Sequence, residues 1–252
     1  MAIRNALVTG CDYGLGLEFV KVLCKNENFR KIFAGCVDPK SATELVKLSQ
    51  ENSNIVPIQL RVDDDESIES AKNLIESQIG SEGLDLLINN AGINQNDGWV
   101  PGKGWVNLNR AHMLKHLNIN TLGPVMLTHA LLPDLRNGAK LNSKSVVLNI
   151  SSDRASISLA RTYQEDFNCP SLSYGLSKAA LNHLTSTLSY YETKNNVISI
   201  AVHPGWIVTP MGGPKATFSA SESAEKILKL VSNLTVPDSG RYMNRDGQDL
   251  DL

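Results

Sequence analysis

Short apolar segments alternate with longer amphipathic segments along most of the chain, and this alternation constrains the fold more than any other feature. The apolar segments fall near residues 6–8, 31–36, 55–60, 84–89, 145–150, 197–202 and 240–243. Segments with helical periodicity lie between them, near residues 14–25, 41–50, 66–79, 106–135, 173–191 and 221–232. Repeats of this kind form parallel sheets whose strands are joined by right-handed crossovers.

Length and composition fit one such unit. The 252 residues suit a single α/β domain, and 42% hydrophobic with 20% charged residues is ordinary for a globular protein. We therefore expect one domain over residues 1–252, with an α/β fold: a Rossmann-like, doubly wound parallel sheet of about seven strands with helices on both faces. Three connections lack periodicity, namely residues 94–104, 153–171 and 206–217.

Several classes of protein are disfavoured by simple counts. A net charge of −2 argues against a nucleic-acid binder. None of the four cysteines forms a CxxC pair, so we expect no metal site, and free thiols suggest a reducing compartment. No apolar run approaches the length of a membrane span, and the first ten residues do not resemble a signal peptide. We expect a cytoplasmic protein with no membrane partner.

A glycine-rich segment follows the first predicted strand and opens the first predicted helix. It reads TGCDYGLG, with Gly10, Gly14 and Gly16 in GxxxGxG spacing and Asp12, Tyr13 and Leu15 between them. Such a turn lets a pyrophosphate approach the backbone and the positive end of the helix. The other interpretation is a purely structural turn, and the position at the start of the α/β repeat favours a cofactor site.

A second motif predicts proton chemistry. Tyr174 and Lys178 are four residues apart, so on a helix they share one face. A nearby cation lowers the pKa of a phenol toward the range useful for acid–base catalysis. Ser151 and Ser152 end the strand before this helix, where a hydroxyl can bind a carbonyl oxygen. The alternatives are a surface Tyr/Lys pair and an ordinary turn serine.

Six motifs occur in a fixed order and resemble the short-chain dehydrogenase/reductases, most of all their sniffer-like carbonyl reductases. They are TGxxxGxG at 9–16, NNAG at 89–92, a helical asparagine at 120, NISS at 149–152, YxxxK at 174–178 and HPGWIVT at 203–209. The resemblance covers essentially the whole chain. It implies a nicotinamide-dependent oxidoreductase.

The resemblance also implies catalytic roles. Tyr174 would be the general acid/base, and Lys178 would lower its pKa and bind the nicotinamide ribose. Ser152, the second serine of its pair, would orient the carbonyl group. Asn120 would support a water in proton transfer, although a backbone-capping role is the alternative.

Cofactor contacts follow from the same resemblance. The glycine turn would cradle the pyrophosphate, with help from the backbone near Leu15. The adenosine side would be lined by Asn89, Ala91 and Gly92, and the nicotinamide would be held by Pro204, Gly205 and Thr209. The same resemblance implies that the three connections without periodicity shape a substrate pocket. Candidate walls of the substrate pocket are Trp99, Tyr163, Phe167, Trp206 and Met211, whose alternative role is packing on the sheet.

The choice between NADP and NAD is where the pattern is broken. Tyr13 and Val37 stand where sniffer-like reductases carry arginines, and Cys36 stands where an NAD-binding acid would be. Of the two charged residues close by, Asp38 favours NAD and Lys40 favours NADP. The resemblance slightly favours NADP(H), and NAD(H) stays open.

Arg61 is a second departure, because the family usually has an aspartate there near the adenine. Either Asp63 takes that place, or Arg61 stacks on the adenine or reaches a phosphate. We hypothesise that Arg61 supplies part of the missing positive charge.

The resulting functional prediction is an NAD(P)-dependent carbonyl reductase or alcohol dehydrogenase that transfers a hydride between nicotinamide and a small-molecule carbonyl substrate. The alternative is a non-catalytic NAD(P)-binding regulatory or interaction protein on the same fold. The family resemblance implies a homodimer or homotetramer. The interval between Ser152 and Tyr174 is longer than usual in the family, so the substrate is left open.

Overall fold

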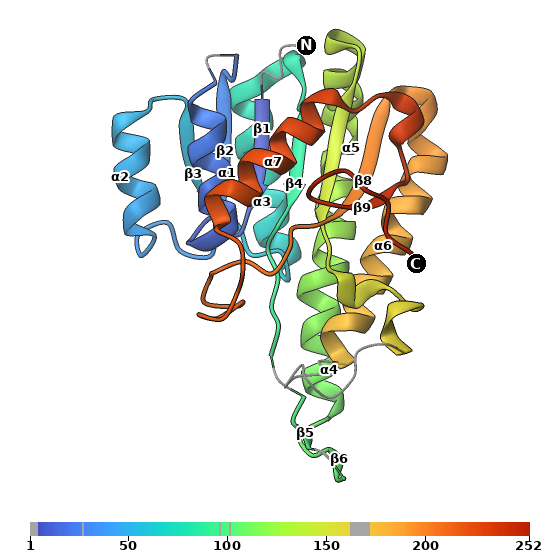
Figure 1. Cartoon of the computed structure of the whole chain (residues 1–252). Helices are drawn as coiled ribbons and strands as arrows, with labels where there is room; N and C mark the ends of the chain where they lie inside the picture. The colour runs from blue at the N-terminus through green and yellow to red at the C-terminus, as the bar shows by residue number, and fades with distance from the viewer. Residues whose placement is uncertain (1–4, 27, 96, 101, 162–171) are drawn as a thin grey trace.

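A parallel sheet organises the computed structural model, which describes residues 5–26, 28–95, 97–100, 102–161 and 172–252 (Figure 1). Its seven strands all run parallel, in the order β3-β2-β1-β4-β7-β8-β9. The strands are β1 (Asn5–Thr9), β2 (Lys31–Cys36), β3 (Ile55–Gln59), β4 (Leu86–Asn89), β7 (Ser145–Ile150), β8 (Val197–His203) and β9 (Tyr242–Asn244).

Helices cover both faces of this sheet. One face carries α1 (Gly14–Cys24), α2 (Thr43–Glu51) and α7 (Ala220–Asn233). The other carries α3 (Asp65–Ile79), α5 (Gly123–Asn142) and α6 (Leu172–Glu192), and α4 (Arg110–Leu117) precedes α5 and packs on α6. The predicted doubly wound, Rossmann-like sheet of about seven strands is confirmed. Short 3₁₀ turns occur at Gly80–Glu82, Asp153–Ala155, Leu159–Arg161, Thr193–Asn195 and Val236–Asp238.

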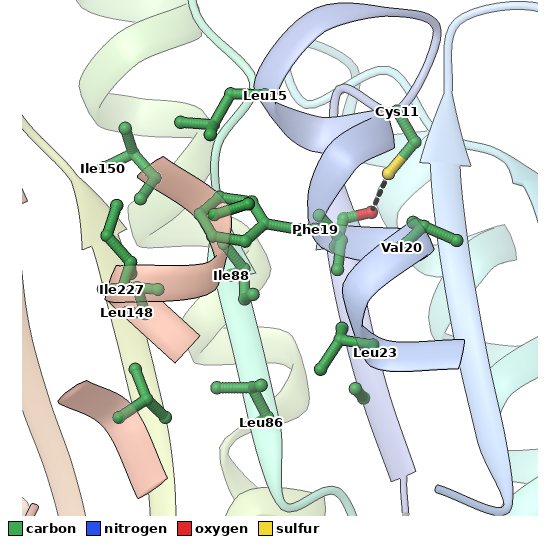
Figure 2. Close-up of a cluster of buried hydrophobic side chains, with 14 of the residues drawn as sticks. Cys11, Leu15, Phe19, Val20, Leu23, Leu86, Ile88, Leu148, Ile150 and Ile227 are labelled. Carbon is green, nitrogen blue, oxygen red and sulfur yellow. Dashed lines mark hydrogen bonds between the residues drawn. The ribbon is translucent and has the colours of Figure 1, made fainter. Parts of the chain in front are cut away.

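The central strands are buried on both sides, which explains their continuous apolar sequences. In β1, Ala6 and Val8 face the layer under α1 and α7, whereas Leu7 faces the layer under α3 and α5. Figure 2 shows the first layer, where the fully buried ring of Phe19 projects from α1 toward Ile88 of β4. Burial of a side chain of this size stabilises the fold by about 2–3 kcal/mol.

The order of the strands reverses between β1 and β4. From β1 the chain builds β2 and β3 on one side, and every later strand of the sheet lies on the other side. The pairing of β1 with β4 ends at Val8 and Ile88, after which the two chains diverge. In open parallel sheets this is where a ligand crevice forms.

The expectation of an irregular loop at 94–104 is wrong in part. A small antiparallel hairpin forms there from β5 (Trp99–Val100) and β6 (Gly104–Trp105), and it projects away from the sheet (Figure 1). Gly98 and Gly104 have positive φ angles, which glycine adopts without steric cost. The hairpin is two residue pairs long, too short for an alternating pattern to predict.

The helix expected at 106–135 also differs from the structure. It begins later, because the Asn109 side chain accepts a hydrogen bond from the His112 backbone N–H at 2.9 Å and caps α4. It continues through a π-helical turn, Asn118–Leu122, into α5, which ends at Asn142. The other predicted elements are found with bounds shifted by at most two residues.

No helix within the described ranges is both long and apolar enough to cross a membrane. Residues 162–171, part of the predicted loop 153–171, lie outside the described residues.

Gly138 lets α5 pack closely on the start of β4. A Cβ atom at this position would collide with the Leu84 carbonyl oxygen and would lie 3.3 Å from the backbone nitrogen of Asp85. Both of those atoms belong to the backbone, so neither can move aside cheaply. The packing therefore requires glycine although the residue lies inside a helix.

We predict that Gly138→Ala destabilises the protein by about 1–3 kcal/mol, because overpacking outweighs the better helix propensity of alanine. Chemical denaturation checks this. Asn137→Ala, at the exposed neighbouring position, is the matched control and should be neutral or slightly stabilising. An increase in stability for Gly138→Ala would contradict the packing argument.

Candidate active site

A cavity of about 840 Å³ opens at the carboxyl ends of β1, β4, β7 and β8, where the strand order reverses. Most of the predicted site residues line it. These are Gly10, Asp12, Tyr13, Gly14, Leu15, Val37, Asp63, Ala91, Gly92, Ser152, Tyr174, Lys178, Pro204, Gly205 and Thr209. Residues from seven separate segments of the sequence are thus brought to one crevice.

The glycine turn has the form that a pyrophosphate requires. Gly10 and Gly14 have φ angles of 70° and 64°, and a Cβ atom at Gly10 would lie 2.9 Å from Cα of Ala91. No acidic residue occupies the first turn of α1, and Tyr13 makes no side-chain cap there. The first-turn N–H groups and the positive helix end therefore face the crevice without a competing carboxylate. These residues fit a dinucleotide.

Gly16 lies behind this turn and does not line the cavity. A Cβ atom there would collide with the Gly10 carbonyl oxygen and would lie 2.6 Å from Nδ2 of Asn90. The third glycine therefore lets α1 pack against the turn, a contact that supports the cradle from below.

Asn90 is a functional position that the sequence reasoning missed. Its side-chain Nδ2 donates to the carbonyl oxygens of Thr9 at 2.8 Å and Gly10 at 3.2 Å. In return, Thr9 Oγ1 accepts hydrogen bonds from the backbone N–H groups of Asn90 at 3.0 Å and Ala91 at 2.9 Å. Asn90 stands in the NNAG motif, which was the available signal.

Asn89, predicted to contact the cofactor, lies beneath the cavity instead. It is buried, and its Nδ2 donates to Asn149 Oδ1 at 2.8 Å and to Thr128 Oγ1 at 3.2 Å. These bonds join β4 to β7 and to α5. Its side chain braces the site rather than touching it.

Asn120 also stays outside the cavity, within the π-helical turn. Its side chain accepts from the backbone N–H of Ile93 and donates to the Ile93 carbonyl oxygen, each at 2.8 Å. Nδ2 also donates to Ser177 Oγ at 3.0 Å. The predicted alternative of a backbone-binding role is what the side chain does in this structure.

The tyrosine, lysine and serine converge as predicted. The side chains of Tyr174 and Ser152 lie close enough to interact, and the Ser152 hydroxyl donates to Asp153 Oδ1 at 3.0 Å. Lys178 lies one turn further along α6, with Nζ 5.7 Å from the centre of the Tyr174 ring, and donates to the Ile150 carbonyl oxygen at 2.7 Å. All three side chains line the inner part of the cavity.

Of the two serines, Ser152 is the one oriented toward Tyr174. Ser151 Oγ donates to the buried Asn182 Oδ1 at 2.6 Å and is directed at α6. The Tyr242 hydroxyl donates to the Ser152 carbonyl oxygen at 2.6 Å, which fixes the backbone of this residue from β9.

Burial controls the acid–base properties of the pair. It raises the pKa of Tyr174 to about 12, against the lowering effect of the Ser152 side chain. Burial likewise lowers the pKa of Lys178 to about 8. The expected lowering of the tyrosine pKa by the lysine is therefore not present in this structure: burial is the largest cause of the raised pKa, and Lys178 is not among the groups that shift it.

The end of the cavity near Val37 carries an ion pair. Arg61 Nη2 lies 3.3 Å from Asp63 Oδ2, and both residues line the cavity. The Val37 backbone N–H donates to Asp12 Oδ1 at 3.1 Å, so this carboxylate supports the turn. Arg61 is half exposed; the other cationic residues among the described lining residues are Arg154, Lys178 and Lys215.

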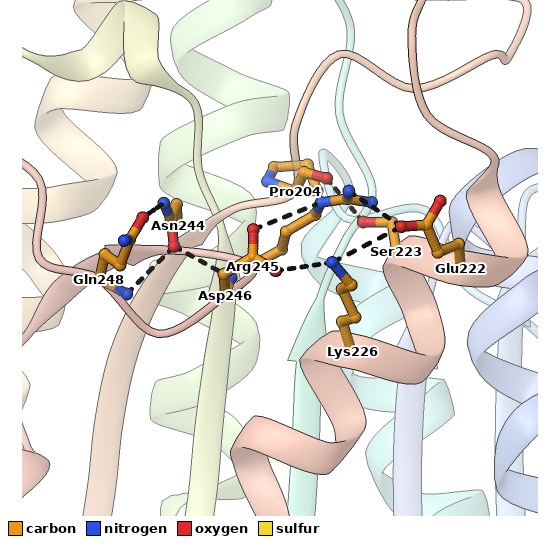
Figure 3. A network of polar contacts seen from close by, with 8 residues as sticks. All are labelled: Pro204, Glu222, Ser223, Lys226, Asn244, Arg245, Asp246 and Gln248. Carbon is orange, nitrogen blue, oxygen red and sulfur yellow. Dashed lines mark hydrogen bonds and ion pairs between the residues drawn. The ribbon is translucent and has the colours of Figure 1, made fainter.

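The segment 204–218 contributes several lining residues to the cavity, and a polar network holds its base (Figure 3). The buried Ser223 hydroxyl donates to the Pro204 carbonyl oxygen at 2.6 Å. The guanidinium of Arg245 stacks on Phe218, 3.5 Å from the ring centre, and Nη2 donates to Glu222 at 3.0 Å. These contacts tie the segment to α7 and to the chain after β9.

The same segment reaches across the crevice. A Cβ atom at Gly14 would lie 3.4 Å from the Thr209 methyl group. Of the predicted pocket walls, Trp206 and Met211 line the cavity, whereas Trp99 belongs to β5. Tyr163 and Phe167 lie outside the described residues.

The cavity is also lined by Arg154, His203 and Lys215, which were not named individually, although Arg154 and Lys215 fall in the loops predicted to shape the substrate pocket. His203 opens the HPGWIVT motif, so a signal was present; burial lowers its pKa. Arg154 follows the serine pair directly. Within the described ranges, no group of three or more His, Cys, Asp or Glu side chains is placed to hold a metal ion.

A parallel sheet with a glycine turn at its switch point and a Tyr–Lys–Ser cluster beside it defines a nucleotide-binding α/β protein equipped for proton transfer. The sequence model of the short chain dehydrogenases matches residues 4–219. The chain belongs to the short-chain dehydrogenase family. The prediction of an oxidoreductase of this family is therefore confirmed.

Similar proteins agree with this assignment. The NADPH-bound carbonyl reductase from chicken fatty liver is 36% identical, with a TM-score of 0.92 and full coverage of both chains. The carbonyl reductase Sniffer of D. melanogaster is 29% identical, with a TM-score of 0.90 over 99% of this chain and 100% of that one. The C-signal protein of Myxococcus xanthus is 34% identical over 167 residues, 66% of this chain and 92% of its own length. The resemblance to sniffer-like carbonyl reductases is confirmed.

We predict that Lys178→Met stabilises the protein at pH 7. The lysine pKa of about 8, below its ordinary 10.5, means that folding a charged Lys178 costs at most about 3 kcal/mol. Loss of the hydrogen bond to Ile150 offsets about 1 kcal/mol of the gain. Denaturation at pH 7 should therefore show a net gain of about 1–2 kcal/mol.

The pH dependence has a definite sign. Between about pH 8 and 10.5 the unfolded wild type binds the proton that the folded protein has lost, so wild-type stability rises relative to the variant. The advantage of Lys178→Met should shrink across that window. Lys47→Met, at an exposed position on α2, is the control. If the extra stability of Lys178→Met did not depend on pH, burial of the charged lysine would not be its cause.

Proposed function

We propose that this protein is an NAD(P)H-dependent carbonyl reductase, or alcohol dehydrogenase in the reverse direction, with Tyr174 as the proton donor. The observation that carries the proposal is that the Tyr174 and Ser152 side chains meet inside the cavity, with Lys178 buried one helical turn away. One carbonyl oxygen can accept from both hydroxyl groups once the Ser152 hydroxyl turns from Asp153 Oδ1.

Ser152 and Tyr174 have separate roles in the proposed reduction of the carbonyl group. Bound nicotinamide supplies the hydride that reaches the carbonyl carbon. Ser152 donates a hydrogen bond to the carbonyl oxygen and orients it, and Tyr174 gives its hydroxyl proton to the same oxygen as negative charge develops there. The raised pKa of Tyr174 keeps that proton in place at neutral pH.

Lys178 completes the proton-transfer site. With a pKa of about 8, it is mostly charged at pH 7, so a positive charge lies 5.7 Å from the centre of the Tyr174 ring when the proton moves. Its bond to the Ile150 carbonyl oxygen holds the ammonium group beneath the cavity. Asn120 contributes indirectly, because it holds Ile93, a cavity residue, and bonds to α6 through Ser177.

For the cofactor we propose NADP(H) in preference to NAD(H), with the glycine turn binding the pyrophosphate. The similar chicken reductase holds NADPH. Arg61 supports the same preference in this chain, since it is a half-exposed cation at the end of the cavity formed by Tyr13 and Val37. Asp63 reduces the net charge there, so the preference should be moderate.

We also propose a homodimer or homotetramer located in the cytoplasm. Support for self-association comes from exposed apolar side chains on the α4–α5 segment and α6, namely Leu114, Leu122, Met126 and Leu176. Sedimentation of the purified protein tests it.

We predict that Tyr174→Phe lowers carbonyl reduction by about 10²–10⁴-fold, the usual contribution of a general acid, while NADPH affinity stays close to that of the wild type. A panel of aldehydes and ketones with NADPH and NADH is the assay. Tyr190→Phe, at an exposed position on the same helix, is the matched control. Full activity in Tyr174→Phe would overturn the assignment. Absence of wild-type turnover on the whole panel would favour a non-catalytic cofactor-binding protein.

We predict that Arg61→Ala weakens NADPH binding by about five- to tenfold, the effect of one well-placed surface charge, and leaves NADH binding nearly unchanged. Fluorescence titration of both cofactors measures this. Arg61→Lys keeps the charge and should retain most of the preference. Equal losses for both cofactors would exclude a role for Arg61 in discrimination.

A further inference from the structure

The segment that follows β4 is held at every second residue by one face of a helix. The holding residues are spaced four apart on α4 and the π-turn, and we call them the helix ladder: His112, His116 and Asn120. Asn120 binds both backbone groups of Ile93 at 2.8 Å. The Gln95 backbone N–H donates to His116 Nε2 at 3.0 Å. At the far end, His112 Nε2 lies 2.7 Å from Oδ1 of Asp97.

The register of these contacts has a simple geometric basis. Four residues of a helix advance about 6 Å, and two residues of extended chain advance about 6.7 Å. A chain segment running antiparallel to the helix can therefore meet one ladder residue at every second position. The match holds from Ile93, which lines the cavity, to Asp97, which is fully buried.

Asp97 also binds α6, the helix that carries Tyr174. Its Oδ2 accepts the backbone N–H of Ser173 at 2.8 Å, and its Oδ1 accepts the Ser173 hydroxyl at 2.9 Å. Ser173 lies in the first turn of α6, where backbone N–H groups have no acceptor within the helix. A carboxylate at this end is also favoured by the helix dipole.

Burial makes this docking specific. A carboxylate with no exposed surface is costly unless its oxygens are well bonded; here Ser173 donates two hydrogen bonds to it, and His112 Nε2 lies at ion-pair distance. Displacement of α6 relative to the 93–97 segment would break two hydrogen bonds to a buried charge. Asp97 therefore restricts both the rotation of α6 about its own axis and its translation along that axis.

We propose that Asp97 is a positioning residue for Tyr174, and that the helix ladder holds Asp97 in place. The docked residue, Ser173, directly precedes Tyr174, so a small rotation of the first turn of α6 would move the phenol hydroxyl away from Ser152. The inference rests on the proposed function, in which Tyr174 donates the proton. Through Ile93, the same ladder links one wall of the cavity to the proton donor.

The test is the single-turnover rate of hydride transfer from NADPH to p-nitrobenzaldehyde, followed by the loss of NADPH absorbance. Asp97→Ala should slow this rate by about 30- to 100-fold, the cost of misplacing a reacting group by about 1 Å. The dissociation constant of NADPH should not change, because Asp97 does not line the cavity. If Asp97 had a purely structural role, Asp97→Ala would lower thermal stability but would not slow hydride transfer while leaving the NADPH dissociation constant unchanged.

A conservative variant distinguishes position from charge. In Asp97→Asn, the amide oxygen can accept from the Ser173 N–H while the amide nitrogen donates to the Ser173 hydroxyl, so most of the rate should return. Ser173→Ala removes one of the two bonds and should slow the rate by about 3- to 10-fold. Ser173→Ala also decides the question if Asp97→Ala does not fold.

Asp85 provides the matched control. It is a buried carboxylate that directly precedes β4, at the amino ends of the strands, and it accepts from the Asn5 backbone N–H at 2.9 Å and from Asn142 Nδ2 at 2.6 Å. Asp85→Ala should lose stability comparably and keep its single-turnover rate at a temperature where it is folded. A loss of rate equal to that of Asp97→Ala would show a general effect of destabilisation and overturn the proposal.

The double variant separates this inference from the proposed function. If Asp97 acts through Tyr174, then Asp97→Ala added to Tyr174→Phe should cause no further loss of the residual rate. An inactive Tyr174→Phe together with wild-type rates in folded Asp97→Ala and Ser173→Ala would reject the positioning role alone. An active Tyr174→Phe would reject the proposed function itself.

Discussion

Reciprocal hydrogen bonds between Thr9 and Asn90 hold the site together. Where β1 and β4 separate, their last backbone groups lose the partners that a continuing sheet would provide. The Thr9 hydroxyl and the Asn90 amide replace those partners and leave a crevice between the two strands. The glycine turn, α1 and the wall of the cavity after β4 are all placed relative to this crosslink.

The sheet could be predicted from the sequence because its determinants are local. A strand covered on both faces must be apolar along its length, so the spans of β2 and β7 were predicted to the residue. The hairpin at 99–105 and the π-turn at Asn118–Leu122 were not predicted. Their conformations depend on glycine φ angles and on contacts with distant segments, which leave no periodic pattern in the sequence.

The site could be predicted only as far as its motifs reach. The motifs located the glycine turn and the Tyr174–Lys178 pair, and the structure brings them to one cavity. They could not show that Asn89 and Asn120 turn away from that cavity to bind other parts of the protein. Nor could they give the sign of the shift in the Tyr174 pKa, because desolvation depends on how much chain closes over the phenol.

The π-turn limits how the length of this chain can vary. A π-turn contains one residue more than the α-helical turn it replaces. Deletion of a single residue between Asn118 and Leu122 would restore regular helix and rotate α4 by about 100° relative to α5. His112 and His116 would then point away from the segment that they hold. Substitutions at the exposed positions of this turn are compatible with the architecture, whereas insertions and deletions are not.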